Sequence, residues 1–83
     1  MIFLIFTEEG LLEAAEEIEQ HQASVWINPT LENNTVIENL SKTGCAISVL
    51  LDEIDANNEK AVMQALTHVE SQTTDTEIYV ELS

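Results

Sequence analysis

Two short acidic segments contain the residues of this chain whose types and spacing could do chemistry. Residues 8–10 follow an apolar run at the start of the chain, and residues 52–55 follow a second apolar run. If both runs are neighbouring parallel strands, their carboxyl ends meet and the carboxylates converge on one crevice. Clustered carboxylate oxygens suit Mg²⁺ or Ca²⁺. The two segments therefore predict a candidate site for Mg²⁺ or Ca²⁺ among five carboxylates, those of Glu8, Glu9, Asp52, Glu53 and Asp55.

This pattern of acids resembles that of a known family. A carboxylate and a glycine after the first strand, with an acidic pair after a later strand, resemble the Toprim domain of primases, topoisomerases and related nucleases. The matching positions are Glu9 with Gly10, and Asp52 with Asp55. The resemblance implies a Mg²⁺-dependent site for phosphoryl transfer or nuclease chemistry. The aspartates are spaced Asp-x-x-Asp here and Asp-x-Asp in Toprim proteins, and no basic residue adjoins them to hold a phosphodiester.

The same carboxylates also have an ordinary structural interpretation. Glu8 and Glu9 fall in the first turn of a predicted helix, where the helix dipole favours acids by roughly 0.3 to 1 kcal/mol. Asp55 has the position of a helix cap or a turn residue. In a chain with sixteen Asp and Glu residues, some fall at any chosen position by chance. We therefore give the structural interpretation more weight than the metal site.

The elements that must position these residues follow from hydrophobic patterning. Apolar runs predict strands at residues 2–6, 24–27, 45–51 and 76–82, and only the last alternates apolar with polar residues. Apolar residues at helical spacing predict helices at 7–20 and 58–69, each preceded by capping residues. Residues 33–43 fit a short helix capped by Asn34 or Thr35 and stopped by Gly44, or else a hairpin arm.

The order of these elements predicts a small α/β domain spanning residues 1–83. Helix-length crossovers favour a mostly parallel four-stranded sheet in a three-layer sandwich. The uninterrupted apolar first and third strands should be central, which gives the strand order 2-1-3-4 with the first helix on one face and the other two opposite. The alternative is a ferredoxin-like βαββαβ fold of the α+β class, without the middle helix.

The charge of the chain limits its partners. Sixteen acidic residues against two lysines and no arginine give a net charge of −14 on 83 residues. Such a surface repels nucleic acids and anionic membranes, whose binding depends on Lys and Arg. We therefore expect neither as a direct partner. A basic protein is the expected partner.

The first predicted helix concentrates this charge. Its glutamates include neighbours at i, i+4, about 6 Å apart along the axis, and like charges at that spacing destabilise a helix. A one-sign pattern that costs stability indicates a binding surface. We expect a non-catalytic module that presents this face to a basic protein, as a DNA mimic or inhibitor does; Mg²⁺-dependent catalysis is the alternative. The residues of the face are Glu8, Glu9, Glu13, Glu16, Glu17 and Glu19.

Localisation and oligomeric state are predicted from weaker signals. The opening run Met1–Phe6 has no basic flank, is too short to span a membrane and precedes no cleavage pattern. The single cysteine, Cys45, cannot form an internal disulfide. These features favour a cytoplasmic protein. A homodimer is an expected alternative to a monomer, because so small a core leaves a thin margin of stability.

Overall fold

The structure is a computed structural model that describes residues 1–82. Three α-helices, one short 3-10 helix and four strands follow one another in the expected βαβαβαβ order. In chain order they are β1 (Ile2–Ile5), α1 (Glu8–His21), β2 (Ser24–Ile27), η1 (Pro29–Leu31), α2 (Thr35–Lys42), β3 (Ile47–Val49), α3 (Glu59–Gln72) and β4 (Ile78–Val80).

The sheet confirms the predicted fold class and corrects the predicted strand order. All four strands are parallel, and they lie in the order β3-β2-β1-β4. The expected order 2-1-3-4 is wrong, because β2 and not β3 shares the centre with β1. The ferredoxin-like alternative is also wrong, since α2 is a helix and β2 pairs with β3 in parallel.

The third apolar run was misleading because most of it is not strand. Only Ile47–Val49 pairs with β2, and each of these residues is half-buried, as fits an edge strand. Cys45, before the strand in the chain, and Leu50, directly after it, are buried, while Leu51 is 87 % exposed. The apolar run therefore indicated neither a continuous strand nor a central position in the sheet.

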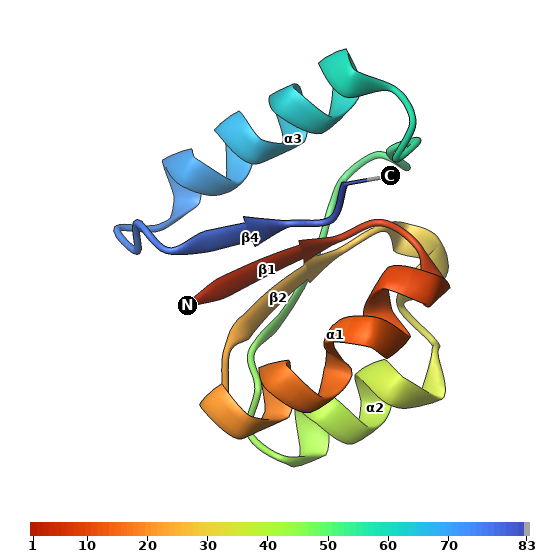
Figure 1. Ribbon diagram of the computed structural model, residues 1–83, viewed down its shortest axis with the longest axis vertical. Coiled ribbons are helices and arrows are strands. Elements are labelled where there is room, and N and C mark those ends of the chain that lie inside the picture. The colour runs from red at the N-terminus through yellow and green to blue at the C-terminus, as the bar shows by residue number, and fades with distance from the viewer. Residues whose placement is uncertain (83) are drawn as a thin grey trace.

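The helices form two layers of unequal size on the sheet (Figure 1). α1 and α2 pack together on one face, and α3 lies alone on the other. The expectation that α1 alone would cover one face is wrong. From β1 through β2 to β3 the chain steps in one direction, so two right-handed crossovers put α1 and α2 on the same side. The connection to β4 runs back past β2 and β1, which puts α3 on the opposite side.

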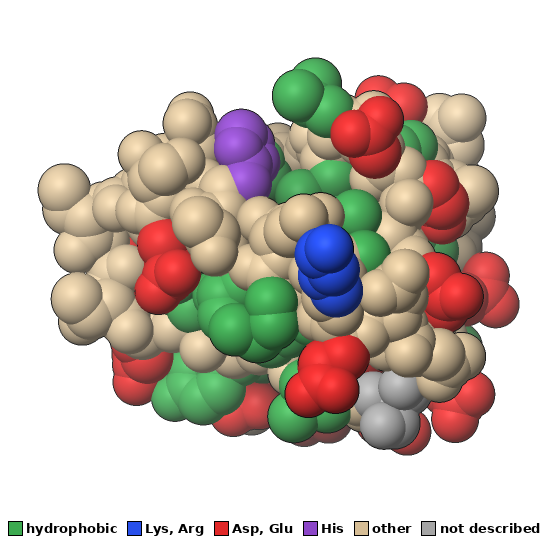
Figure 2. Space-filling model, turned by 90° about the horizontal axis from the view of Figure 1, so that it is seen from above, with side chains coloured by type: hydrophobic (Ala, Val, Ile, Leu, Met, Phe, Trp, Pro, Cys, Tyr) green, Lys and Arg blue, Asp and Glu red, His purple; other side chains and the backbone are tan. Residues whose placement is uncertain are grey.

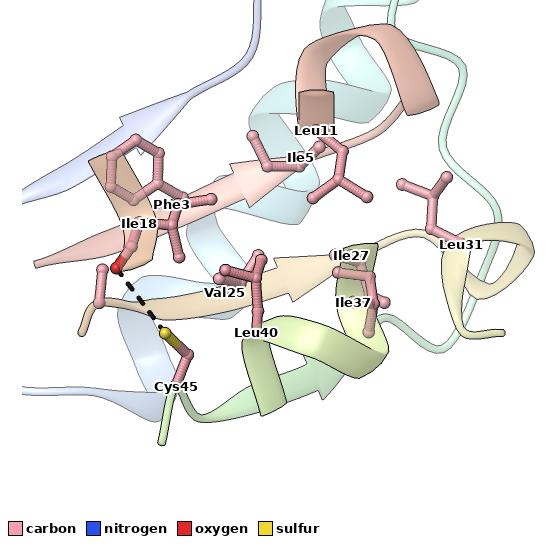
Figure 3. Close-up of a cluster of buried hydrophobic side chains, with 11 residues drawn as sticks. Phe3, Ile5, Leu11, Ile18, Val25, Ile27, Leu31, Ile37, Leu40 and Cys45 are labelled. Atoms are coloured by element: carbon pink, nitrogen blue, oxygen red, sulfur yellow. Dashed lines mark hydrogen bonds between the residues drawn. The ribbon is translucent and has the colours of Figure 1, made fainter. Parts of the chain in front are cut away.

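Each layer has its own apolar core. In the first, drawn in Figure 3, side chains of α1 and α2 meet one face of β1 and β2. The Cys45 thiol lies in this core and donates to the Ile18 carbonyl at 3.7 Å. The second core joins the other face of β1 to α3, and its buried members are Ile2, Leu4, Phe6, Leu50, Val62, Ala65 and Val69.

The helix ends follow local signals that the sequence already displayed. Thr7, Asn34 and Asn58 are the N-caps of α1, α2 and α3, and each side chain accepts a hydrogen bond from a backbone N–H of the first turn. After α2 the chain turns at Gly44, whose φ of +99° suits glycine. No helix within residues 1–82 is long and apolar enough to cross a membrane.

Candidate functional site

The acidic face of α1 consists of the six glutamates Glu8, Glu9, Glu13, Glu16, Glu17 and Glu19. All six are exposed, and α1 contains no lysine or arginine. Of residues 1–82, only Lys42 with Glu38 and the Met1 amino group with Asp75 form ion pairs. No ion pair within residues 1–82 therefore compensates the acidic face, which lies on a helix whose inner side chains Leu11 and Ile18 are completely buried.

The glutamates divide into a side toward α2 and a side toward β4. Glu8 and Glu19 are three turns apart and share one side, and the Asn34 amide at the start of α2 donates to Glu8 at 2.9 Å. Glu13 and Glu17 are one turn apart and face β4, where they line a groove. The face thus curves around half of the helix and ends at the edge of the sheet.

The α1/β4 groove exists because α1 and α2 leave β4 uncovered on their side of the sheet. It has a volume of about 270 Å³, and its lining includes Phe3, Ile5, Glu13, Ala14, Glu17 and Tyr79. The Tyr79 ring stacks on the Phe3 ring with 5.2 Å between centroids and is 45 % exposed. The groove therefore combines an aromatic and aliphatic floor with carboxylates along one wall.

Glu81 closes the end of this groove and ties β4 to the start of α1. One carboxylate oxygen accepts from the backbone N–H groups of Phe6 and Thr7, at 2.8 and 3.0 Å, and the other accepts from the Thr7 hydroxyl at 2.6 Å. The same hydroxyl accepts from the Gly10 N–H at 3.1 Å, which caps the helix. A Cβ at Gly10 would come within 2.4 to 2.7 Å of the Glu81 carboxylate group, so a larger residue there would displace this side chain from its hydrogen bonds.

Sequence reasoning missed Glu81. The alternation of residues 76–82 placed it on the wet side of the strand but could not show that this side faces the β1–α1 junction. The junction lies at the carboxyl edge between β1 and β4, where the chain reverses direction across the sheet. A carboxylate from the chain itself thus occupies the helix N-terminus where an anionic ligand would otherwise be favoured.

The side chains around Tyr79 raise its pKa above the usual value of 10.0. The largest cause is the hydrogen bond that the Tyr79 hydroxyl donates to Glu77 at 3.0 Å, followed by the negative charge of Glu77 itself. Glu17 on α1 adds a smaller electrostatic contribution. The charge of the acidic face therefore reaches β4. In the connection from α3 to β4, Asp75 has a pKa below its usual value, because its carboxylate accepts hydrogen bonds from the Met1 amino group and the Glu77 N–H.

The structure does not gather the three predicted magnesium ligands. β2 lies between β1 and β3, and the segments that follow these two strands are bridged by the side chain of Asn28, which follows β2. Across residues 1–82, no three His, Cys, Asp or Glu side chains are placed to hold a metal ion. Asp55 instead accepts from the Asn57 N–H at 2.9 Å, as a turn residue does. The crevice expected from the Toprim resemblance is therefore not formed.

Asn28 occupies the position where that crevice was expected. Its side chain is 1 % exposed. Its amide nitrogen donates to the carbonyls of Phe6 and Ile54, and its oxygen accepts from the Ile54 N–H, all at 2.8 Å. These bonds join the ends of β1 and β2 to the segment after β3. Asn28 is thus a structural residue whose side-chain groups are satisfied within the chain.

The two histidines form no site with each other or with Cys45. His21 lies exposed at the end of α1, and His68 lies on α3, where its ring meets Trp26 edge-on at 5.7 Å. Cys45 is buried in the core. What the fold and the site define is therefore a small parallel α/β domain with an acidic helix and a groove beside an edge strand. Comparisons with protein-family models, curated proteins and solved structures found no match to this chain.

Proposed function

We propose that this protein is a non-catalytic binding module that presents the acidic face of α1 to a basic protein. The observation that supports this most strongly is the lack of compensation on that helix: six exposed glutamates, no lysine or arginine, and no ion-pair partner within residues 1–82. Unpaired like charges at i, i+4 destabilise α1. A partner that supplies lysines and arginines removes that repulsion on binding.

The packing of α1 makes the face rigid before a partner arrives. Leu11 and Ile18 are completely buried beneath it, and the Thr7 cap and Glu81 hold its first turn. A helix backbone that is fixed in advance loses little further freedom on binding, which favours affinity. Carboxylates one turn apart are about 6 Å apart along the axis. A rigid row of negative charge of this kind suits a protein surface that otherwise binds DNA phosphates, so a DNA mimic or inhibitor is one form of the proposed activity.

The proposal is tested with two variants that remove the same charge, one from α1 and the other from elsewhere on the surface. The first carries Glu→Gln at positions 9, 13, 16 and 17 of α1, and the second carries E32Q, D52N, E59Q and E70Q. The immobilised wild-type protein is used to isolate basic partners at low salt, and the partner's affinity for each purified variant is then measured. We expect the α1 variant to lose about tenfold or more in affinity and the second variant about threefold or less.

Salt and chelator separate this function from the alternative of metal-dependent chemistry. Binding should weaken steeply as ionic strength rises from 0.01 M, where the Debye length is about 30 Å, to 0.15 M, where it is about 8 Å. Binding should be unchanged by EDTA. Equal loss of affinity in both variants would show that net charge alone attracts the partner, and the absence of any basic partner at low salt would refute the proposal.

A further inference from the structure

β4 is an edge strand with one side free of strand pairing. It pairs only with β1 among residues 1–82, through groups that include the Glu77 carbonyl and the Glu81 N–H. Backbone groups of alternate residues in a strand point to the same side. The N–H and C=O groups of Ile78 and Val80 therefore point away from β1. An exposed edge of this kind is a template for a further strand.

The α1/β4 groove runs beside this open edge. Ile78 and Val80 pack toward α3 on one face of the strand, while Tyr79 on the other face forms part of the groove. At about 270 Å³ the groove is just below the roughly 300 to 1,000 Å³ of small-molecule pockets. A single long side chain is a closer match in size than a whole small ligand. The structure thus places a side-chain-sized pocket next to unpaired backbone groups.

The charges around the groove select the kind of side chain that fits. Glu13 and Glu17 line it from α1, and Glu77 and Glu81 flank Tyr79 along β4. The raised pKa of Tyr79 reports the negative potential of Glu77 and Glu17 at this place. A Lys or Arg side chain would lay its aliphatic stem on the aromatic floor and its charge near the carboxylates.

A second copy of this chain does not fit the edge as well. In an antiparallel pair of β4 strands centred on Tyr79, Glu77 of each copy would lie near Glu81 of the other. Like charges directly opposite one another destabilise a sheet, and each copy carries a net charge of −14. Charge complementarity therefore favours a basic strand from a different protein.

We propose that a basic, extended segment of the partner adds to β4 as a fifth strand and places a Lys or Arg side chain in the α1/β4 groove. This inference rests on the proposed function and names the form of the partner and its docking position. The backbone bonds to Ile78 and Val80 set the register. Glu13 and Glu17 set the preference for a cation at the position over Tyr79.

The test uses two synthetic peptides of equal charge. One alternates lysine with valine, and the other has the same sequence with N-methyl groups that remove every second backbone N–H. We expect the first peptide to slow hydrogen exchange at the Ile78 and Val80 amides by about tenfold or more, because the peptide carbonyls accept from them. The N-methylated peptide should bind at least about fivefold more weakly, since it cannot complete the ladder.

Variants of the protein test the edge and the groove separately. V80P removes an outward N–H, a change that an edge strand tolerates, and circular dichroism checks that the variant folds. In this variant the lysine–valine peptide should no longer slow hydrogen exchange at the Ile78 amide. E13Q/E17Q should lower the affinity for the lysine–valine peptide by about three- to tenfold, and the control E16Q/E19Q should lower it by about twofold or less.

Two contrary results have different meanings. In the first, both peptides bind with equal affinity, and E13Q/E17Q and E16Q/E19Q lower that affinity equally. Docking on β4 is then refuted, while the acidic face remains a binding surface. If neither peptide nor any basic protein binds at low salt, the proposed function fails together with this inference. The N-methylated peptide keeps the test valid if V80P does not fold.

Discussion

α1 and α3 are helices of equal length that cover opposite faces of one sheet, yet their outer surfaces differ. Each has 14 residues, an N-cap side chain and a buried apolar stripe. α1 carries six glutamates without a cation, whereas α3 carries only Glu59, Lys60 and Glu70. Figure 2 shows the face with α3 as a mixed surface of uncharged side chains and backbone with apolar patches, a basic side chain near the middle and carboxylates mainly toward the edges. Covering the sheet therefore does not require the charge that α1 carries.

The two helices are also anchored differently. The start of α3 is capped by a neighbouring residue, since Asn58 accepts from the Ala61 N–H at 3.1 Å. The start of α1 has such a cap in Thr7, and it is also held by Glu81 from the other end of the chain. The helix with unfavourable charge is thus the one with a long-range support at its N-terminus.

The largest effect on stability is expected from truncating a side chain in the buried apolar stripe of either helix, a feature that α1 and α3 share. L11A and V69A each truncate a completely buried side chain, the first in the core under α1 and the second in the core under α3. L11A should lower the free energy of unfolding by about 2 to 5 kcal/mol and V69A by about 2 kcal/mol. Urea denaturation followed by circular dichroism measures both. If V69A left the unfolding midpoint unchanged, α3 would not belong to the same cooperative unit as α1.

The caps should show the difference in anchoring. T7V removes the cap of α1 and the hydroxyl bonded to Glu81, and should cost about 2 to 3 kcal/mol. N58A removes only a local cap and should cost about 1 kcal/mol. Adding E81A to each variant separates the two effects. E81A should cost clearly less in the T7V background than in N58A, and equal costs would contradict a coupling between Thr7 and Glu81.

A smaller effect of opposite sign is expected on the outer surface of α1. Glu13 is spaced i, i+4 from both Glu9 and Glu17, so E13Q removes two like-charge pairs. It should raise the free energy of unfolding by roughly 0.4 to 1 kcal/mol at low salt, and the gain should shrink as salt increases. E70Q on α3 is the matched control and should change stability less. A destabilised E13Q would mean that the glutamates support the helix and are not a cost to it.

The smallest effect is expected at alkaline pH. Tyr79 is the only tyrosine, so tyrosinate absorbance reports its titration alone. Because folding raises its pKa above 10.0, its contribution to stability is complete below pH 10 and is lost as pH rises through the folded-state pKa. E77Q should lower the pKa of Tyr79 most, and E17Q should lower it less. An unchanged titration in both variants would contradict the negative potential inferred at the groove.

Much of the local structure could be predicted from sequence because its causes lie within a few residues. Thr7 caps α1 and Gly44 follows the end of α2, as predicted, and of the two predicted caps of α2, Asn34 and Thr35, it is Asn34 that caps the helix. The second strand, Ser24–Ile27, has the predicted bounds. The residues of the acidic face could be named in advance for the same reason: their positions relative to Leu11 and Ile18 follow from helical geometry.

The candidate site was predicted only in part. The acidic wall of the groove was anticipated, since Glu13 and Glu17 belong to the predicted face. The floor and the open edge were not, because they depend on which strand lies beside β1. With the predicted order, a different pair of loops would have met at the reversal point, and Glu9, Asp52 and Asp55 would have converged there.

The sequence by itself therefore determined where the helices begin, which side of each helix is apolar, and that α1 carries acid without a lysine or arginine. These properties depend on neighbours at fixed chain spacing. Only the tertiary structure decided that β2 is central, that α1 and α2 share a face, and that Glu81 meets the start of α1 beside Gly10. The physical reason is that strand order is set by competition among alternative ways of covering the same apolar surfaces, and residues distant in the chain contribute to every one of them.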